Sequence, residues 1–88
     1  MRIRRSHELG MQEARKRADR IAKDLADEYG VRAQWEGDHI VVRSSGINGQ
    51  MLVAEEYIEL QVKLGFAMSL MEAPIRAVIE RTIDEELA

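Results

Sequence analysis

The chain has 88 residues, of which 45% are hydrophobic and 33% charged, and it contains no cysteine. This composition excludes a disordered chain and predicts one globular domain over residues 1–88 with a thin core. The lack of cysteine excludes disulfides and thiolate chemistry and agrees with a reducing, cytoplasmic location. No stretch approaches the roughly 20 apolar residues of a membrane span, so we expect no membrane-spanning segment.

The net charge of −3 is unevenly distributed. Residues 1–23 carry eight Lys and Arg against three Asp and Glu, whereas residues 24–88 carry five against thirteen. A basic segment of this kind either contacts nucleic acid or forms a solvated helix face and a charged edge strand. The interleaved acids favour the second interpretation, so nucleic acid is not the expected partner. A nucleic-acid site would use six basic side chains: Arg2, Arg4, Arg5, Arg15, Lys16 and Arg20.

The first elements along the chain are a strand and a long helix. Ile3 to Ser6 is typical of a short strand, and Ser6 or Gly10 can open the helix that follows. Gly30 is predicted to end this helix in a left-handed conformation. Apolar residues at three- and four-residue spacing place one face of the helix on the core: Met11, Ala14, Ala18, Ile21, Ala22, Leu25 and Tyr29.

Four strands are predicted after Gly30, because apolar and polar residues then alternate. Val31 to Glu36 and His39 to Arg43 flank a Gly37-Asp38 turn. Two further strands direct these residues inward: Ile47, Met51 and Val53, then Ile58, Leu60, Val62 and Leu64. Short turns make this meander antiparallel. The predicted fold class is α+β, a five-stranded, mainly antiparallel sheet with two helices packed on one face, in the order β-α-β-β-β-β-α.

The last helix is apolar around an unusually wide arc. From Phe66 to Ile79 the apolar side chains span about 220° at 100° per residue, whereas a surface helix needs an apolar stripe of about 100°. Pro74 either kinks this helix or divides it into two pieces, the second starting at Pro74. The wide arc then reflects either a kinked core helix or a surface for self-association or a partner. The candidate surface residues are Phe66, Met68, Met71 and Ile79.

No residue set predicts a reaction, a cofactor or a metal site. The two histidines, His7 and His39, lack the spacing of zinc ligands, and we expect both at the surface. Ser44-Ser45-Gly46 has no adjacent base. Trp35 alternates in phase with Val31 and Ala33, which favours a core position over base stacking. We therefore expect a protein that is not an enzyme, with no catalytic, cofactor-binding or metal-binding residues.

Several short motifs resemble one bacterial family. In chain order they are His7-Glu8-Leu9-Gly10-Met11-Gln12-Glu13-Ala14-Arg15, Trp35-Glu36-Gly37-Asp38, Ser45-Gly46-Ile47-Asn48-Gly49, Leu64-Gly65-Phe66 and Pro74-Ile75. Their order and spacing resemble the polyhydroxyalkanoic acid system family, over nearly the full chain. The resemblance implies a link to cytoplasmic polyester storage granules, but no catalytic residues. The strand pattern differs from the helical phasins that coat such granules, and it is similar to a reduced helix-grip domain.

The favoured hypothesis is a non-enzymatic accessory protein of polyhydroxyalkanoate metabolism that acts through apolar contacts. Its candidate partners are a second copy in a homodimer, a granule-associated protein, or the polyester granule surface. The alternative is a small hydrophobic-ligand-binding domain with a cleft near Trp35, Leu60 and Met71, although a usual ligand pocket needs about 300 Å³ or more. A nucleic-acid-binding module is the third hypothesis.

Overall fold

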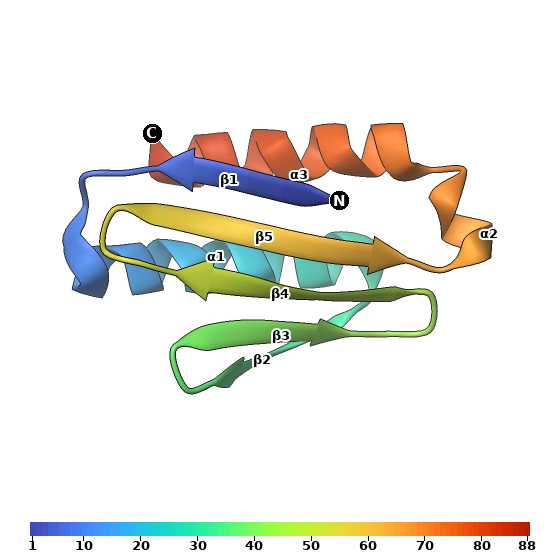
Figure 1. Ribbon diagram of the computed structural model, residues 1–88, viewed down its shortest axis with the longest axis horizontal. Helices are drawn as coiled ribbons and strands as arrows, with labels where there is room; N and C mark the ends of the chain where they lie inside the picture. The colour runs from blue at the N-terminus through green and yellow to red at the C-terminus, as the bar shows by residue number, and fades with distance from the viewer.

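The structure is a computed structural model that describes residues 1–88, and it has two layers (Figure 1). One layer is a sheet of β1 (Arg2–Ser6), β2 (Arg32–Glu36), β3 (His39–Arg43), β4 (Ile47–Val53) and β5 (Tyr57–Leu64). The other contains α1 (Gly10–Tyr29) and α3 (Glu72–Leu87), which run in opposite directions along one face of the sheet (Figure 1). A short helix, α2 (Phe66–Ser69), joins β5 to α3. The predicted α+β fold is confirmed.

The strand order is β1-β5-β4-β3-β2, and every neighbouring pair is antiparallel. Strands β2 to β5 form the predicted meander. Helix α1 carries the chain from β1 at one edge of the sheet to β2 at the other edge (Figure 1). Both strands that flank α1 in the sequence are therefore edge strands, and β1 is placed beside β5, the last strand of the meander.

The core lies between the helices and one face of the sheet. The face of α1 that meets the sheet is rich in alanine, and Ala14, Ala18 and Ala22 are all buried. These small side chains let the helix approach the sheet closely. The most deeply buried large side chains come from both layers: Ile3, Ile21, Ile40, Met51, Ile58 and Ile83. The inward residues predicted for β4 and β5 include the buried Met51, Val53, Ile58 and Leu60, which confirms the predicted inward face of these strands.

The C-terminal apolar segment is two helices. Helix α2 ends at Ser69, and α3 starts at Glu72. Pro74 therefore lies in the first turn of α3, where a residue needs no amide for the helical hydrogen bonds, so the proline is tolerated there. Of the two predicted outcomes, division of the helix is the one observed, with the second piece starting two residues before Pro74.

Candidate contact surface

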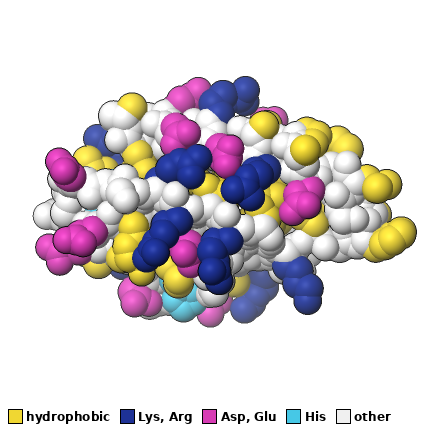
Figure 2. Space-filling model, turned by 45° about the horizontal axis from the view of Figure 1, so that its top comes forward, with side chains coloured by type: hydrophobic (Ala, Val, Ile, Leu, Met, Phe, Trp, Pro, Cys, Tyr) yellow, Lys and Arg dark blue, Asp and Glu magenta, His cyan; other side chains and the backbone are white.

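The most exposed apolar side chains lie at one end of the molecule, on α2 and the turn that follows it. Phe66 is 93% exposed, Leu70 86% and Met71 50%. We call these three residues the apolar tip. Figure 2 shows hydrophobic side chains gathered at the right-hand end of the molecule, the end at which Figure 1 places α2. Contiguous exposed apolar side chains of this kind mark contact sites on folded proteins.

Two glycines hold the start of α2 against the β3–β4 loop. The amide of Gly65, directly before α2, donates a hydrogen bond to the carbonyl oxygen of Gly46 in the β3–β4 loop, over 2.8 Å. Gly46 has a φ of 96°, which side chains disfavour, and a Cβ there would lie 3.3 Å from Cγ of Met68. The closeness of these backbones fixes the direction in which α2 leaves β5. Phe66 and Leu70 consequently project away from the core.

The four candidate surface residues differ in how far the structure exposes them. Phe66 and Met71 belong to the apolar tip, whereas Ile79 is 3% exposed and lies in the core with Ile75 and Ile83. Met68 is half-buried and packs against the core cluster. Ile79 is therefore left out of the candidate surface, because α3 directs it to the sheet.

Leu70 was missed among the candidate surface residues. Its signal in the sequence was its place within the wide apolar arc. In a continuous helix, at about 100° per residue, Leu70 would lie about 140° from Ile75 and about 180° from Ile79. The arc therefore contained both an outward and an inward side, and its width alone did not tell them apart. In the structure α2 ends at Ser69, and Leu70 lies in the turn before α3, where its side chain is exposed.

The interior has no room for a ligand of the usual size. The apolar gap between α1, α3 and the sheet is about 40 Å³, against about 300 Å³ or more for a typical ligand pocket. Leu60 lines this gap, but Trp35 and Met71 do not. The cleft predicted near Trp35, Leu60 and Met71 is thus not formed, because Ile75 and Ile79 of α3 pack onto the sheet.

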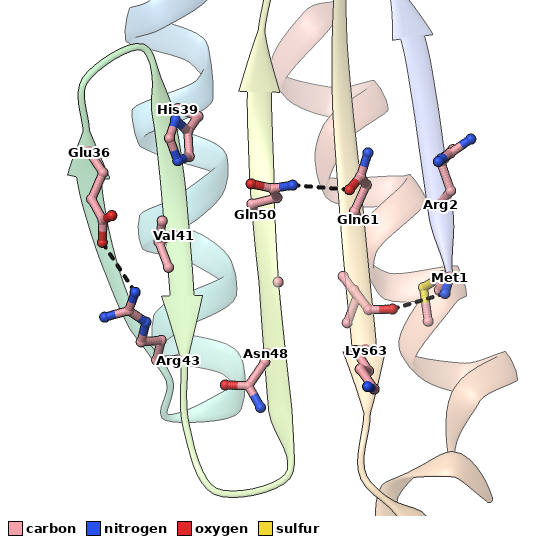
Figure 3. Close-up of a pocket in the computed structure, with 12 residues that line it drawn as sticks. Met1, Arg2, Glu36, His39, Val41, Arg43, Asn48, Gln50, Gln61 and Lys63 are labelled. Carbon is pink, nitrogen blue, oxygen red and sulfur yellow. Dashed lines mark hydrogen bonds and ion pairs between the residues drawn. The ribbon is translucent and has the colours of Figure 1, made fainter.

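A broad polar hollow of about 750 Å³ lies on the open face of the sheet, opposite the helices (Figure 3). Four of its side chains bond in two pairs. Gln50 donates to Gln61 over 3.1 Å, and Arg43 pairs with Glu36 over 3.5 Å. The N-terminal ammonium donates to the carbonyl oxygen of Val62 over 2.9 Å. The hollow is shallow and wide, with cations and amides across it, and it differs from the apolar tip in both shape and chemistry.

The six basic side chains of the nucleic-acid hypothesis do not form one surface. Arg2 and Arg4 lie on the open face of the sheet, where both approach Glu59, at 3.9 and 3.8 Å. Arg5 faces the opposite way and pairs with Asp84 of α3 over 3.0 Å. The other three belong to α1, on the far side of the sheet: Arg15, Lys16 and Arg20. This division leaves the basic residues dispersed over both faces of the molecule.

Both ring nitrogens of His7 form hydrogen bonds. The amide of Leu9 donates to Nδ1 over 3.2 Å, and Nε2 lies 2.9 Å from the carbonyl oxygen of Ala54. Since an amide only donates and a carbonyl only accepts, these partners assign the proton to Nε2. His7 follows β1 and joins the β1–α1 corner to the β4–β5 turn, and it is half-buried where a surface position was expected. The ring of His39, in contrast, has one hydrogen-bond partner, Asp38, over 3.3 Å.

Trp35 packs against the core at the sheet edge, as expected, and α1 covers it. Its indole N–H donates to Asp19 over 3.2 Å, and the guanidinium of Arg15 lies 4.2 Å from the ring centroid. Hydrogen bonds from Lys23 first, and from Trp35 second, hold the pKa of Asp19 below its usual value of 3.8. The hydrogen bond from Trp35 to Asp19 and the stacking of Arg15 on the indole ring anchor β2 to α1.

The fold and its surface define a small α+β protein with an exposed apolar tip. A protein-family model described as "Putative polyhydroxyalkanoic acid system protein (PHA_gran_rgn)" matches residues 1–87. The chain therefore belongs to the polyhydroxyalkanoic acid system family, and the resemblance seen in its motifs is confirmed. No curated protein and no solved structure gives a match. None of the three helices combines the length and hydropathy needed to cross a membrane.

Proposed function

We propose that this protein is a non-enzymatic accessory protein of the polyhydroxyalkanoate system, and that it contacts the polyester granule surface through its apolar tip. Membership of the family supports the link to this system. The single observation that supports the mode of contact is the exposure of Phe66 and Leu70. The site of action we propose is the cytoplasm, where such granules accumulate in bacteria.

The shape of the apolar tip favours a soft apolar surface as its partner. Phe66 begins α2 and Leu70 directly follows it, at the end of the molecule where Figure 1 places α2. Both side chains are almost fully exposed, and neither lines a pocket. Projecting side chains can insert into an amorphous polyester, as apolar side chains of interfacial helices insert into a lipid surface. A partner protein would have to supply a matching pocket. The polyester surface needs no such complementarity.

The expected strength of this contact is low. Removal of one large apolar side chain from water contributes about 1.5–3 kcal/mol. Phe66 and Leu70 together would contribute roughly 3–6 kcal/mol, and a millimolar dissociation constant corresponds to about 4 kcal/mol. We therefore expect one apolar tip to bind reversibly and weakly.

Co-sedimentation with protein-free polyhydroxyalkanoate particles tests this function. We expect the native chain to sediment with the particles, and the double variant Phe66→Asp/Leu70→Asp to stay in the supernatant. The matched control is Met11→Asp. Met11 is 41% exposed and lies in the first turn of α1, away from α2. Its substitution makes the same kind of change outside the apolar tip, so this variant should sediment like the native chain.

Two results would contradict the proposal. One is a native chain that stays in the supernatant, and the other is a double variant that sediments as well as the native chain. If the native chain sediments only with particles that still carry granule proteins, the partner is a protein and not the polyester. Circular dichroism of each variant confirms that it is folded.

A further inference from the structure

The outer edge of β2 has no strand partner, because β2 is the last strand in the order β1-β5-β4-β3-β2. Figure 1 shows no helix or loop alongside this edge. Every residue of β2 except the half-buried Trp35 is exposed. An open edge of this kind can add a strand from another chain through main-chain hydrogen bonds.

The ladder between β3 and β4 decides which β2 residues face this edge. In antiparallel strands, residues bond alternately to one neighbour and to the other. The amide of Ser44 donates to Ile47 across the β3–β4 ladder, so Ile40 and Val42, which alternate with it, also face β4. The remaining β3 residues face β2, where their partners are Glu36, Gln34 and Arg32. The main-chain groups of Ala33 and Trp35 therefore point to the open edge.

We propose that two copies of the chain associate by antiparallel pairing of their β2 strands, with Gln34 on the twofold axis. This register is the one that makes β2 complementary to itself. Arg32 then lies opposite the partner's Glu36, and the two symmetry-related pairs bring opposite charges together. Ala33 lies opposite the partner's Trp35, which places a small side chain beside a large one. The main-chain groups of Ala33 then face those of the partner's Trp35, and both sets point to the shared edge.

Arg32 has an unfavourable neighbour within one chain, and this dimer corrects it. In the β2–β3 ladder Arg32 lies directly opposite Arg43, a like charge. Arg43 pairs with Glu36 over 3.5 Å, whereas Arg32 has no ion pair within the chain. The partner's Glu36 would supply the missing acid next to Arg32.

The other edge of the sheet lacks this complementarity. Strand β1 contains Arg2, Arg4 and Arg5 but no acidic residue. Pairing of two β1 strands would bring like charges together. Arg5 is also engaged with α3, through Asp84 at 3.0 Å and Glu80 at 3.6 Å. Only the β2 edge is therefore suited to self-pairing.

A dimer of this kind would join the two sheets into one, with all long helices on the same face. The twofold axis would be perpendicular to the sheet and would place the two apolar tips at opposite ends. Two weak sites on one particle bind a surface far more strongly than either site alone. The argument for β2 pairing does not depend on the proposed granule contact, and a separate experiment tests it.

Sedimentation velocity over a dilution series measures the association directly. We expect the native chain to reach twice its mass of 10.1 kDa as concentration rises. Arg32→Glu and Glu36→Arg should each abolish the dimer, because each places like charges opposite one another. The double variant Arg32→Glu/Glu36→Arg should restore it, because it exchanges the two charges. Restoration by this exchange would assign the register as well as the edge.

Proline substitution separates edge pairing from folding. Ala33→Pro removes an amide that points to the open edge, so the chain should fold but remain a monomer. The matched control is Ser6→Pro. The main chain of Met1 bonds to Val62 of β5, and the amide of His7 bonds to Glu56, directly before β5. The main-chain groups of Ser6, which alternates with them, therefore face the other open edge. This control should still form the dimer.

Three results would overturn the inference. They are a native chain that is monomeric throughout the series, a folded Ala33→Pro variant that still forms the dimer, and a native dimer that is abolished by Phe66→Asp/Leu70→Asp. The last result would assign the interface to the apolar tip. Far-ultraviolet circular dichroism checks the fold of each variant.

Discussion

The amide of Gly65 donates to the carbonyl oxygen of Gly46 over 2.8 Å, and this bond connects two loops that are far apart in the sequence. A Cβ on Gly65 would lie 3.4 Å from Cα of Gly46, so the two backbones are in direct contact. Through this contact the β3–β4 loop supports the start of α2. The exposure of Phe66 and Leu70 thus depends on a pair of glycines that neither belongs to the apolar tip nor lies in the core.

The first prediction concerns Gly46. Gly46→Ala should lower the free energy of unfolding by about 1–3 kcal/mol, because a side chain is strained at positive φ. The new Cβ would also press on Met68, at 3.3 Å from its Cγ. Urea denaturation measures the loss. Ser45→Ala, in the same loop, should change stability by no more than about 0.5 kcal/mol. Equal losses in the two variants would contradict the role of the Gly46 conformation.

The second prediction concerns His7. His7→Ala should cost about 1–3 kcal/mol, because the amide of Leu9 and the carbonyl of Ala54 both lose their partner in a half-buried corner. His39→Ala should cost no more than about 0.5 kcal/mol, since the ring of His39 has one hydrogen bond only, to the exposed Asp38. Thermal or urea unfolding compares the two variants. The Nε2–H tautomer of His7 is checked by nitrogen chemical shifts, and a proton on Nδ1 would refute the assignment.

The third prediction concerns Gly49, where β4 and β5 approach closely. A Cβ at this position would lie 2.5 Å from the main-chain oxygen of Gln61, so the strands would have to move apart. Gly49→Ala should therefore destabilise the fold by about 1–3 kcal/mol. The neighbouring Asn48→Ala is the control, because Asn48 is exposed. A Gly49→Ala variant as stable as the native chain would show that the ladder adjusts at no cost.

The fourth prediction concerns the pH dependence contributed by Asp19. Its pKa is held below 3.8 in the folded chain, chiefly by Lys23 and then by Trp35. Because the folded pKa is the lower one, this carboxylate stabilises the fold above pH 3.8, and the contribution disappears as pH falls through the folded pKa. The stability difference between the native chain and Asp19→Asn should therefore shrink on acidification. An Asp19 titration midpoint at or above 3.8 by NMR would contradict the assigned contacts.

The fifth prediction contrasts the two ends of the former apolar arc. Leu70→Ala should change the free energy of unfolding by no more than about 0.5 kcal/mol, because Leu70 is 86% exposed. Ile79→Ala should cost about 2–5 kcal/mol, because it leaves a cavity in the core. Chemical denaturation of both variants measures the contrast. A large loss for Leu70→Ala would mean that α2 packs against the protein and is not free for contact.

Local patterns determined much of this fold. Alternation in residues 57–64 predicts which side chains of β5 face the core, and Ile58 and Leu60 are indeed buried there. Gly30 was predicted to end α1 in a left-handed conformation, and its φ is 65°. Such features depend on neighbouring residues along the chain, because helical and strand periods and glycine conformations are local properties.

The tertiary structure decided what depends on distant segments. It placed β1 beside β5, and it separated Leu70, which is exposed, from Ile79, which is buried, although both belong to one apolar arc in the sequence. The sequence showed an excess of apolar surface and a proline that could break the helix. Where the break falls, and which side chains it exposes, depends on how α3 packs on the sheet and on the contact between Gly46 and Gly65. These are long-range contacts, and hydrophobic periodicity carries no information about them.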